Sequence, residues 1–150
     1  MLRVGTPKQR DLSEDLMEKA VEFHGHGGPF MVVGLRMGLM ALKRLDACGW
    51  FDLRCNVKLM WSPPDSCVID GIQSSTGCTM GKHNIVVEEE DGVAAHFFNR
   101  NKKLSVSLKH GILKKIREAS TEGEDEVMAL MTRLMRASEN DIFEVSLEYI

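Results

Sequence analysis

The feature that most constrains this chain is a histidine- and glycine-rich segment at residues 23–29, with the sequence FHGHGGP. Apolar residues recur at helical spacing before it, over residues 12–23, and again after it, over residues 30–47. Asp11 and Glu14 form a candidate capping box at the start of the first helix. A run of glycines followed by a proline cannot continue a helix. The sequence therefore predicts two helices joined by a short turn.

The turn carries two histidines, His24 and His26, which would point to opposite sides of a continuous helix. They can converge only if the backbone leaves the helix between them, and Gly25 favours that. Imidazole is a good ligand for zinc, nickel, copper and iron. The alternative is a helix-ending turn in which one histidine caps the helix as a cation. The residues alone leave both interpretations open.

A second candidate ligand is Cys67, in the first turn of a helix predicted at residues 66–75 and capped by Asp65. The helix dipole at that position favours the thiolate, which is the form that binds a metal or attacks an electrophile. Asp70 lies one turn further on and could bind the metal or orient a ligand. A small buried thiol is the alternative.

A third candidate is Cys78, which two glycines bracket in a loop that also contains Lys82, a cation that would lower a thiol pKa. The spacing is one residue short of a phosphate-binding P-loop. The predicted helix would separate Cys67 from Cys78 by about 15 Å. We therefore expect the metal ligands to be His24, His26 and Cys78. Cys67 would join them only through a dimer or a folded-back loop, and His83 is a reserve ligand.

The rest of the chain predicts one α+β domain over residues 1–150, with a mostly antiparallel sheet of four to five strands packed with N- and C-terminal helices. Asp91-Gly92 is a hairpin signal that should pair the strands on either side of it. The expected strands are 54–61, 85–90, 93–100, 104–108 and 142–149, and the later helices are 110–119 and 124–137.

Composition restricts the function. The net charge of −3 gives no reason to expect nucleic acid binding. Residues 1–10 are polar and do not resemble a signal peptide, and no apolar run is long enough for a membrane span. We therefore expect a cytoplasmic protein with reduced cysteines. The basic stretch 100–117 is interpreted as solvated surface, with an anion-binding face as the alternative.

In this order, the motifs resemble those of a known family, the E-type subunit of formylmethanofuran dehydrogenase and its stand-alone relatives. The resemblance covers about residues 12 to 110. It rests on three segments, which are FHGH before the glycine-rich helix, CVIDGIQ at residues 67–73, and TGCTMGKHN at residues 76–84.

The resemblance implies an α+β core, a homodimer and a bound metal, often zinc. Nickel is possible because it also accepts imidazole and thiolate ligands. The family usually has a cysteine two residues after the second histidine, where this chain has Gly28. The chain also lacks the C-terminal zinc-ribbon cysteines of larger members. The molybdenum or tungsten cofactor of the dehydrogenase belongs to other subunits, which are possible partners.

Three hypotheses follow. The first is a metal-binding homodimer, accessory to molybdenum or tungsten enzymes or to metal handling. The second is a stand-alone enzyme on an unknown small molecule, in which the metal activates water or Cys78 acts as nucleophile. The third is an interaction module that uses the methionine-rich face of the helix at residues 124–137 and the Gly34/Gly38 face.

Overall fold

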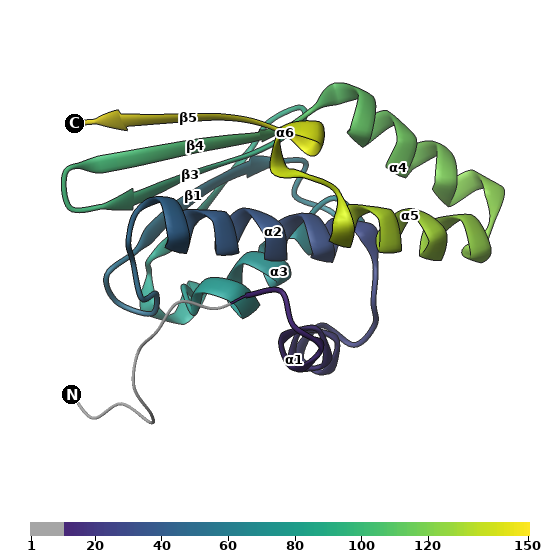
Figure 1. Ribbon diagram of the computed structural model, residues 1–150, viewed down its shortest axis with the longest axis horizontal. Coiled ribbons are helices and arrows are strands. Elements are labelled where there is room, and N and C mark those ends of the chain that lie inside the picture. Colours follow the sequence, from purple (N-terminus) through teal and green to yellow (C-terminus); the bar gives the residue numbers. More distant parts are fainter. Residues whose placement is uncertain (1–10) are drawn as a thin grey trace.

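The computed structural model describes residues 11–150 and confirms the α+β fold (Figure 1). The polar segment 1–10, where no signal peptide is expected, lies outside the described residues. No helix in residues 11–150 is long and apolar enough to cross a bilayer. The elements are α1 (Glu14–His24), α2 (Pro29–Arg44), β1 (Arg54–Leu59), α3 (Cys67–Thr76), η1 (Met80–Lys82), β2 (Ile85–Glu89), β3 (Val93–Asn99), β4 (Lys102–Leu108), α4 (His110–Glu122), α5 (Glu124–Arg136), α6 (Glu139–Ile142) and β5 (Phe143–Tyr149).

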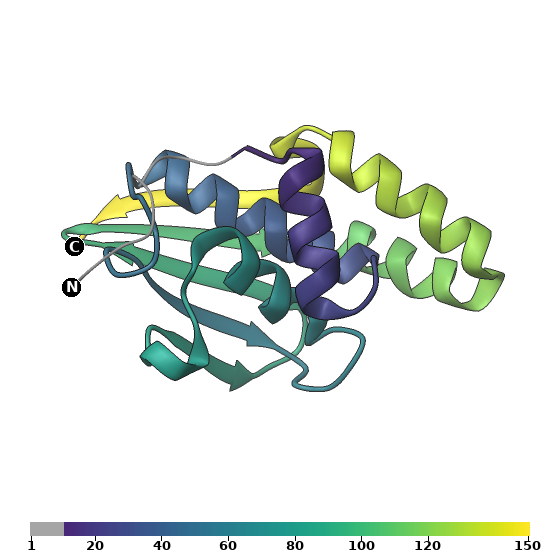
Figure 2. The same cartoon turned by 90° about the horizontal axis from the view of Figure 1, so that it is seen from below.

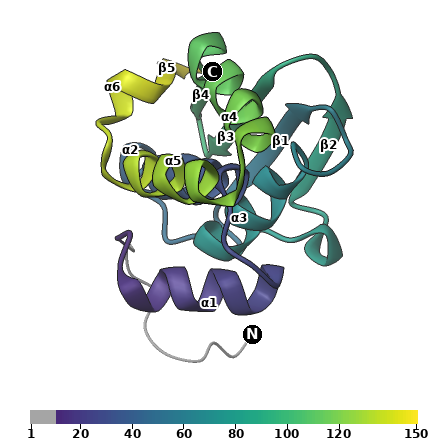
Figure 3. The same cartoon turned by 90° about the vertical axis from the view of Figure 1, so that its right-hand side faces the viewer.

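Two layers of helix lie on one side of the sheet (Figures 1 and 3). Helices α2 and α3 lie nearer the strands, and α1 packs against α3 farther out. Figure 2 looks onto this side, with α1 in front of α2. The core between helices and sheet contains fully buried side chains such as Met37, Leu42, Ile72, Phe97 and Leu104.

Helices α2 and α3 approach each other closely because glycines lie at their contact. A Cβ atom at Gly34 would lie 2.0 Å from the Val68 carbonyl oxygen, and one at Gly71 would lie 2.1 Å from the Met31 carbonyl oxygen. Both distances are far inside van der Waals contact. The Gly34 face is therefore used within the chain for helix packing, which fixes the first turn of α3 relative to α2.

The strand order is β2-β1-β3-β4-β5, with β1 and β2 parallel and the other neighbours antiparallel. The predicted hairpin between β2 and β3 is therefore wrong, since β1 lies between these strands. A tight type I′ hairpin turn needs positive φ at both central residues. Here only Gly92 has it, at 85°, and Asp91 does not. The turn carries the chain past the end of β1 instead of folding β3 back onto β2.

The two predicted helix caps also differ from the structure. Helix α1 is capped by Ser13, whose hydroxyl accepts a hydrogen bond from the Leu16 amide at 3.1 Å, and not by Asp11. Asp65 does not cap α3, because its carboxylate accepts a hydrogen bond from the Arg117 guanidinium at 2.9 Å. An ion pair with a distant helix therefore replaces the local cap expected from the sequence.

The C-terminal helices α4 and α5 form a hairpin around Gly123, which has a φ of 122°, and project beyond the end of the sheet (Figure 1). The guanidinium of Arg36 on α2 holds the end of α5, since it donates to the carbonyl oxygens of Leu134 at 2.6 Å and Ala137 at 2.7 Å. These bonds tie the hairpin to the helix that follows the histidine turn.

Candidate metal centre

The turn between α1 and α2 brings its two histidines together. Helix α1 ends at His24, and Gly25 adopts the left-handed conformation with a φ of 100°. The chain leaves the helix between the two histidines, as the sequence predicts. The ring centroids of His24 and His26 lie 4.5 Å apart, with an angle of 43° between the ring planes.

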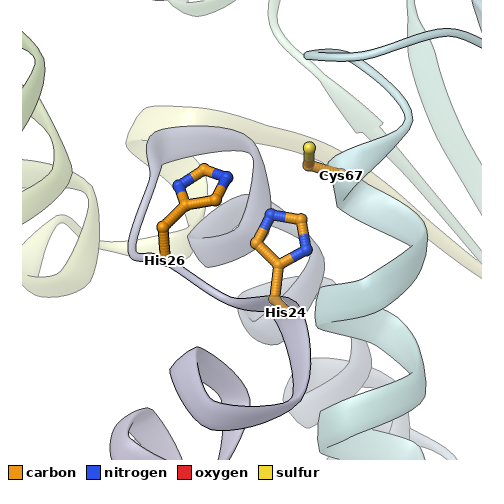
Figure 4. Close-up of side chains that lie close together, drawn as sticks. All are labelled: His24, His26 and Cys67. Carbon is orange, nitrogen blue, oxygen red and sulfur yellow. The ribbon is translucent and has the colours of Figure 1, made fainter.

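The third member of the group is Cys67, the first residue of α3. One potential ligand atom from each of His24, His26 and Cys67 lies within 4.8 Å of the others. Figure 4 shows the two rings and the thiol around a common space, with His24 at the end of α1 and Cys67 at the start of α3. The packing of α1 on α3 thus assembles two segments that are far apart in the sequence.

His24 is the most constrained of the three side chains. Its Nδ1 lies 2.5 Å from the Asp70 carboxylate oxygen Oδ2, and its side chain is only 8% exposed. Because a carboxylate accepts hydrogen bonds, Nδ1 carries a proton, and in the neutral ring Nε2 then has a lone pair for a metal ion. Nε2 is buried and has no hydrogen-bond partner in the described residues. A buried polar atom without a partner costs about 1–3 kcal/mol, which a bound ion would recover.

His26 has a similar arrangement with a backbone acceptor. Its Nδ1 lies 3.1 Å from the Gly27 carbonyl oxygen, which leaves Nε2 free to bind a metal. The ring is more exposed than that of His24. Both imidazoles are therefore held by Nδ1 and offer Nε2, an arrangement common among metal-binding histidines.

The pKa of the Cys67 thiol differs from the low value expected at a helix start. Burial raises its pKa above the usual value, and the carboxylates of Asp70 and Asp65 raise it further. These effects favour the protonated thiol, which is opposite to the direction expected from the helix start. A metal ion would have to displace the thiol proton on binding.

Cys78 lies elsewhere. Its side chain is fully buried, and its Sγ donates a hydrogen bond to the Leu53 carbonyl oxygen at 3.4 Å. Burial raises the pKa of this thiol, and the opposing effect of Lys82 is smaller. The structure therefore groups Cys67, and not Cys78, with the two histidines. The reason is that the N-terminal end of α3 lies beside the turn, while Cys78 follows its C-terminal end.

The remaining histidines are not part of this group. His96 on β3 shares a hydrogen bond with the Ser105 hydroxyl at 2.8 Å, and His110 is the first residue of α4. His83, the reserve ligand, is exposed after η1.

The three donors open onto a cavity of about 280 Å³. Its far wall comes from the α4–α5 hairpin, which the sequence did not connect with the site. The amphipathic pattern of these helices showed an apolar face, but not what that face would cover. Residues of this wall are Ile116, Ser120, Glu124, Val127 and Met128.

The donor set fits a transition metal. Ligand atoms about 2.0–2.3 Å from a tetrahedral zinc ion lie about 3.5 Å apart, so small side-chain movements from the present separations suffice. Two imidazole nitrogens and one thiolate leave a fourth position open. Gly28 lines the same cavity as the three donors, and a Cβ atom there would lie 3.5 Å from Cε1 of His26.

Fold and site together define a small α+β protein with a candidate His/His/Cys metal centre beside a cavity. A family model described as FmdE, molybdenum formylmethanofuran dehydrogenase operon, matches residues 23–144, and the chain belongs to this family. This confirms the resemblance inferred from the sequence motifs.

Two known proteins extend the comparison. A tungsten formylmethanofuran dehydrogenase FmdE-like protein from Syntrophus aciditrophicus has a similar fold, with a TM-score of 0.63 and 21% identity over 91% of this chain and 72% of that one. A probable S-adenosyl-L-methionine-binding protein from Archaeoglobus fulgidus is 35% identical over 77 residues. That match takes in 47% of this chain and spans only 20% of the length of the relative.

Proposed function

We propose that this protein binds one transition-metal ion, most favourably zinc with nickel as the alternative, through Nε2 of His24, Nε2 of His26 and Sγ of Cys67. The observation that carries the proposal is the buried, unpartnered Nε2 of His24 beside two further donors. Cys78 is left out because its thiol faces a backbone carbonyl oxygen in the core.

Family membership supports a role related to formylmethanofuran dehydrogenase. Within that role we propose that the chain is a homodimeric accessory protein of a molybdenum or tungsten enzyme, or a metal-handling protein. The donor set supports the metal-handling part of this proposal. Association with the dehydrogenase is tested by co-purification of its other subunits with a tagged chain.

Metal titration of the stripped protein, followed by elemental analysis, tests the site. The wild type should retain one equivalent of zinc, and His24→Ala, His26→Ala and Cys67→Ser should each lower the affinity by at least about 10-fold. Cys78→Ser and His83→Ala are the matched controls and should retain the ion. Equal retention by Cys67→Ser and wild type, or loss in Cys78→Ser alone, would contradict the proposed ligand set.

A second candidate function is a stand-alone metal-dependent enzyme, and the cavity beside the open position favours it. A metal ion with an open position acts as a Lewis acid and acidifies water. The alternative with Cys78 as nucleophile has less support, because that thiol is buried and its pKa is raised. Metal-dependent turnover that is unchanged in Cys78→Ser and lost in His24→Ala would support the metal version.

A further inference from the structure

Among the described residues, the cavity beside the metal centre has one charged wall residue besides the histidines and the cysteine. Glu124, at the start of α5, is the only carboxylate among the described residues that line it, and no described lysine or arginine lines it. Glu124 makes no ion pair with any other residue in 11–150. Its charge is therefore available to a ligand.

The other walls are mostly apolar. Met31 and Pro64 lie on the side of α2 and α3, and Ile116, Val127 and Met128 lie on the α4–α5 hairpin. The volume of about 280 Å³ is at the lower limit for ligand pockets, which favours a molecule of a few carbon atoms. A cavity lined by metal donors, one carboxylate and apolar side chains suits a short ligand with a metal-binding atom, an apolar body and a cationic group.

We propose that the cavity binds a small amine-bearing organic molecule, whose donor atom takes the open metal position and whose ammonium group lies at Glu124. This inference rests on the proposed metal site and specifies the ligand class of that site. A ligand with an anionic group at the Glu124 end is disfavoured, because the described residues lining the cavity offer that group a carboxylate and no lysine or arginine.

Cobalt(II) replaces zinc as a spectroscopic probe in the test. Three thiols of equal chain length, 3-aminopropane-1-thiol, propane-1-thiol and 3-mercaptopropionate, are titrated into the cobalt-loaded full chain. Cys67 already gives a near-ultraviolet sulfur-to-cobalt charge-transfer band, so the increase of this band reports binding of the added thiol. Elemental analysis confirms that cobalt stays bound. We expect the aminothiol to bind most tightly and the mercaptopropionate most weakly.

Glu124→Gln should lower the affinity for the aminothiol by about two- to five-fold, leave propane-1-thiol unchanged and raise the affinity for mercaptopropionate. Asp125→Asn, which neutralises the neighbouring acid in the same first turn of α5 but does not line the cavity, is the matched control and should behave as wild type.

The outcomes separate the two proposals. A cobalt band that no thiol perturbs overturns the ligand assignment and leaves the metal site intact. The same ratio of aminothiol to propane-1-thiol affinity in Glu124→Gln and wild type does so as well. The tightest binding by mercaptopropionate also overturns it. Absence of any cobalt band overturns the metal site, and the cavity proposal with it.

Discussion

At the scale of single residues, Asp70 determines which nitrogen of His24 is free. Its carboxylate holds Nδ1 at 2.5 Å and thereby leaves Nε2 as the nitrogen available to an ion. The sequence showed that Asp70 lies one turn after Cys67 and could orient a ligand. It could not show that the ligand is a histidine on another helix, since that depends on how α1 packs on α3.

Asp70→Asn tests this role. The amide can still accept a hydrogen bond from Nδ1, but it is neutral and does not increase the basicity of the ring. We expect about a 10-fold loss of zinc affinity, measured by competition with a chromogenic chelator. Asp91→Asn, in an exposed turn, is the control and should bind zinc as the wild type does. Unchanged affinity in Asp70→Asn would show that the carboxylate has no influence on the site.

Gly28→Cys tests whether the fourth metal position is open. Gly28 has extended backbone angles, with φ −163° and ψ 161°, which any residue adopts, and its added Cβ atom would make ordinary contact with His26. We expect the new thiol to close the shell, raise cobalt affinity by about 10-fold or more and prevent added thiols from binding. Gly28→Ala is the control. Identical cobalt spectra of the two variants would contradict an open position beside Gly28.

The choice between the two cysteines shows what sequence spacing can decide. The predicted helix begins near residue 67 and ends before residue 78. In the structure Cys67 is the first residue of α3 and Cys78 follows its C-terminal end. The spacing therefore predicted their separation. Which end of α3 meets the histidine turn depends on the contact between α1 and α3, and no local pattern encodes that contact. We expected Cys78 beside the histidines because the sequence does not reveal the contact between α1 and α3.

At the scale of elements, the contact between α2 and α3 positions Cys67. Gly34→Ala would place a methyl group 2.0 Å from the Val68 carbonyl oxygen and force the helices apart. We expect a loss of about 3 kcal/mol in the free energy of unfolding, measured by urea denaturation. Gly111→Ala is the matched control, because nothing lies within 4 Å of the added Cβ atom, and it should stabilise the protein by up to about 1 kcal/mol. Equal effects of the two changes would contradict close packing at Gly34.

Most helices and strands could be predicted from periodicity, but their pairing could not. The predicted hairpin at Asp91-Gly92 is a case in point, since β1 intervenes between β2 and β3. Hydrophobic alternation identifies a strand, whereas its neighbour depends on the crossover through α3, which makes β2 parallel to β1. The cavity was missed for a related reason, because one of its walls comes from α4 and α5, which only the tertiary fold brings to the histidine turn.

At the scale of the whole molecule, the homodimer remains a prediction. The edge strand β5 is a candidate dimer contact that can be tested by mutation. On β5 the side chains of Leu147 and Tyr149 are exposed, at 46% and 72%. An exposed apolar edge strand favours pairing with another chain. Sedimentation equilibrium should give about twice the 16.8 kDa chain mass, and Leu147→Lys should shift the protein toward the monomer. A monomeric wild type at micromolar concentration would contradict the dimer.

The donors and the far wall of the cavity come from separate stretches of the chain. His24, His26 and Cys67 belong to the first half, whereas the α4–α5 wall begins only after the fourth strand. Mutations in the second half of the chain can therefore change the shape of the cavity without changing any atom that would hold the ion. Relatives that share the donors can diverge in the molecules they admit, and comparing their wall residues is a route to their different ligands.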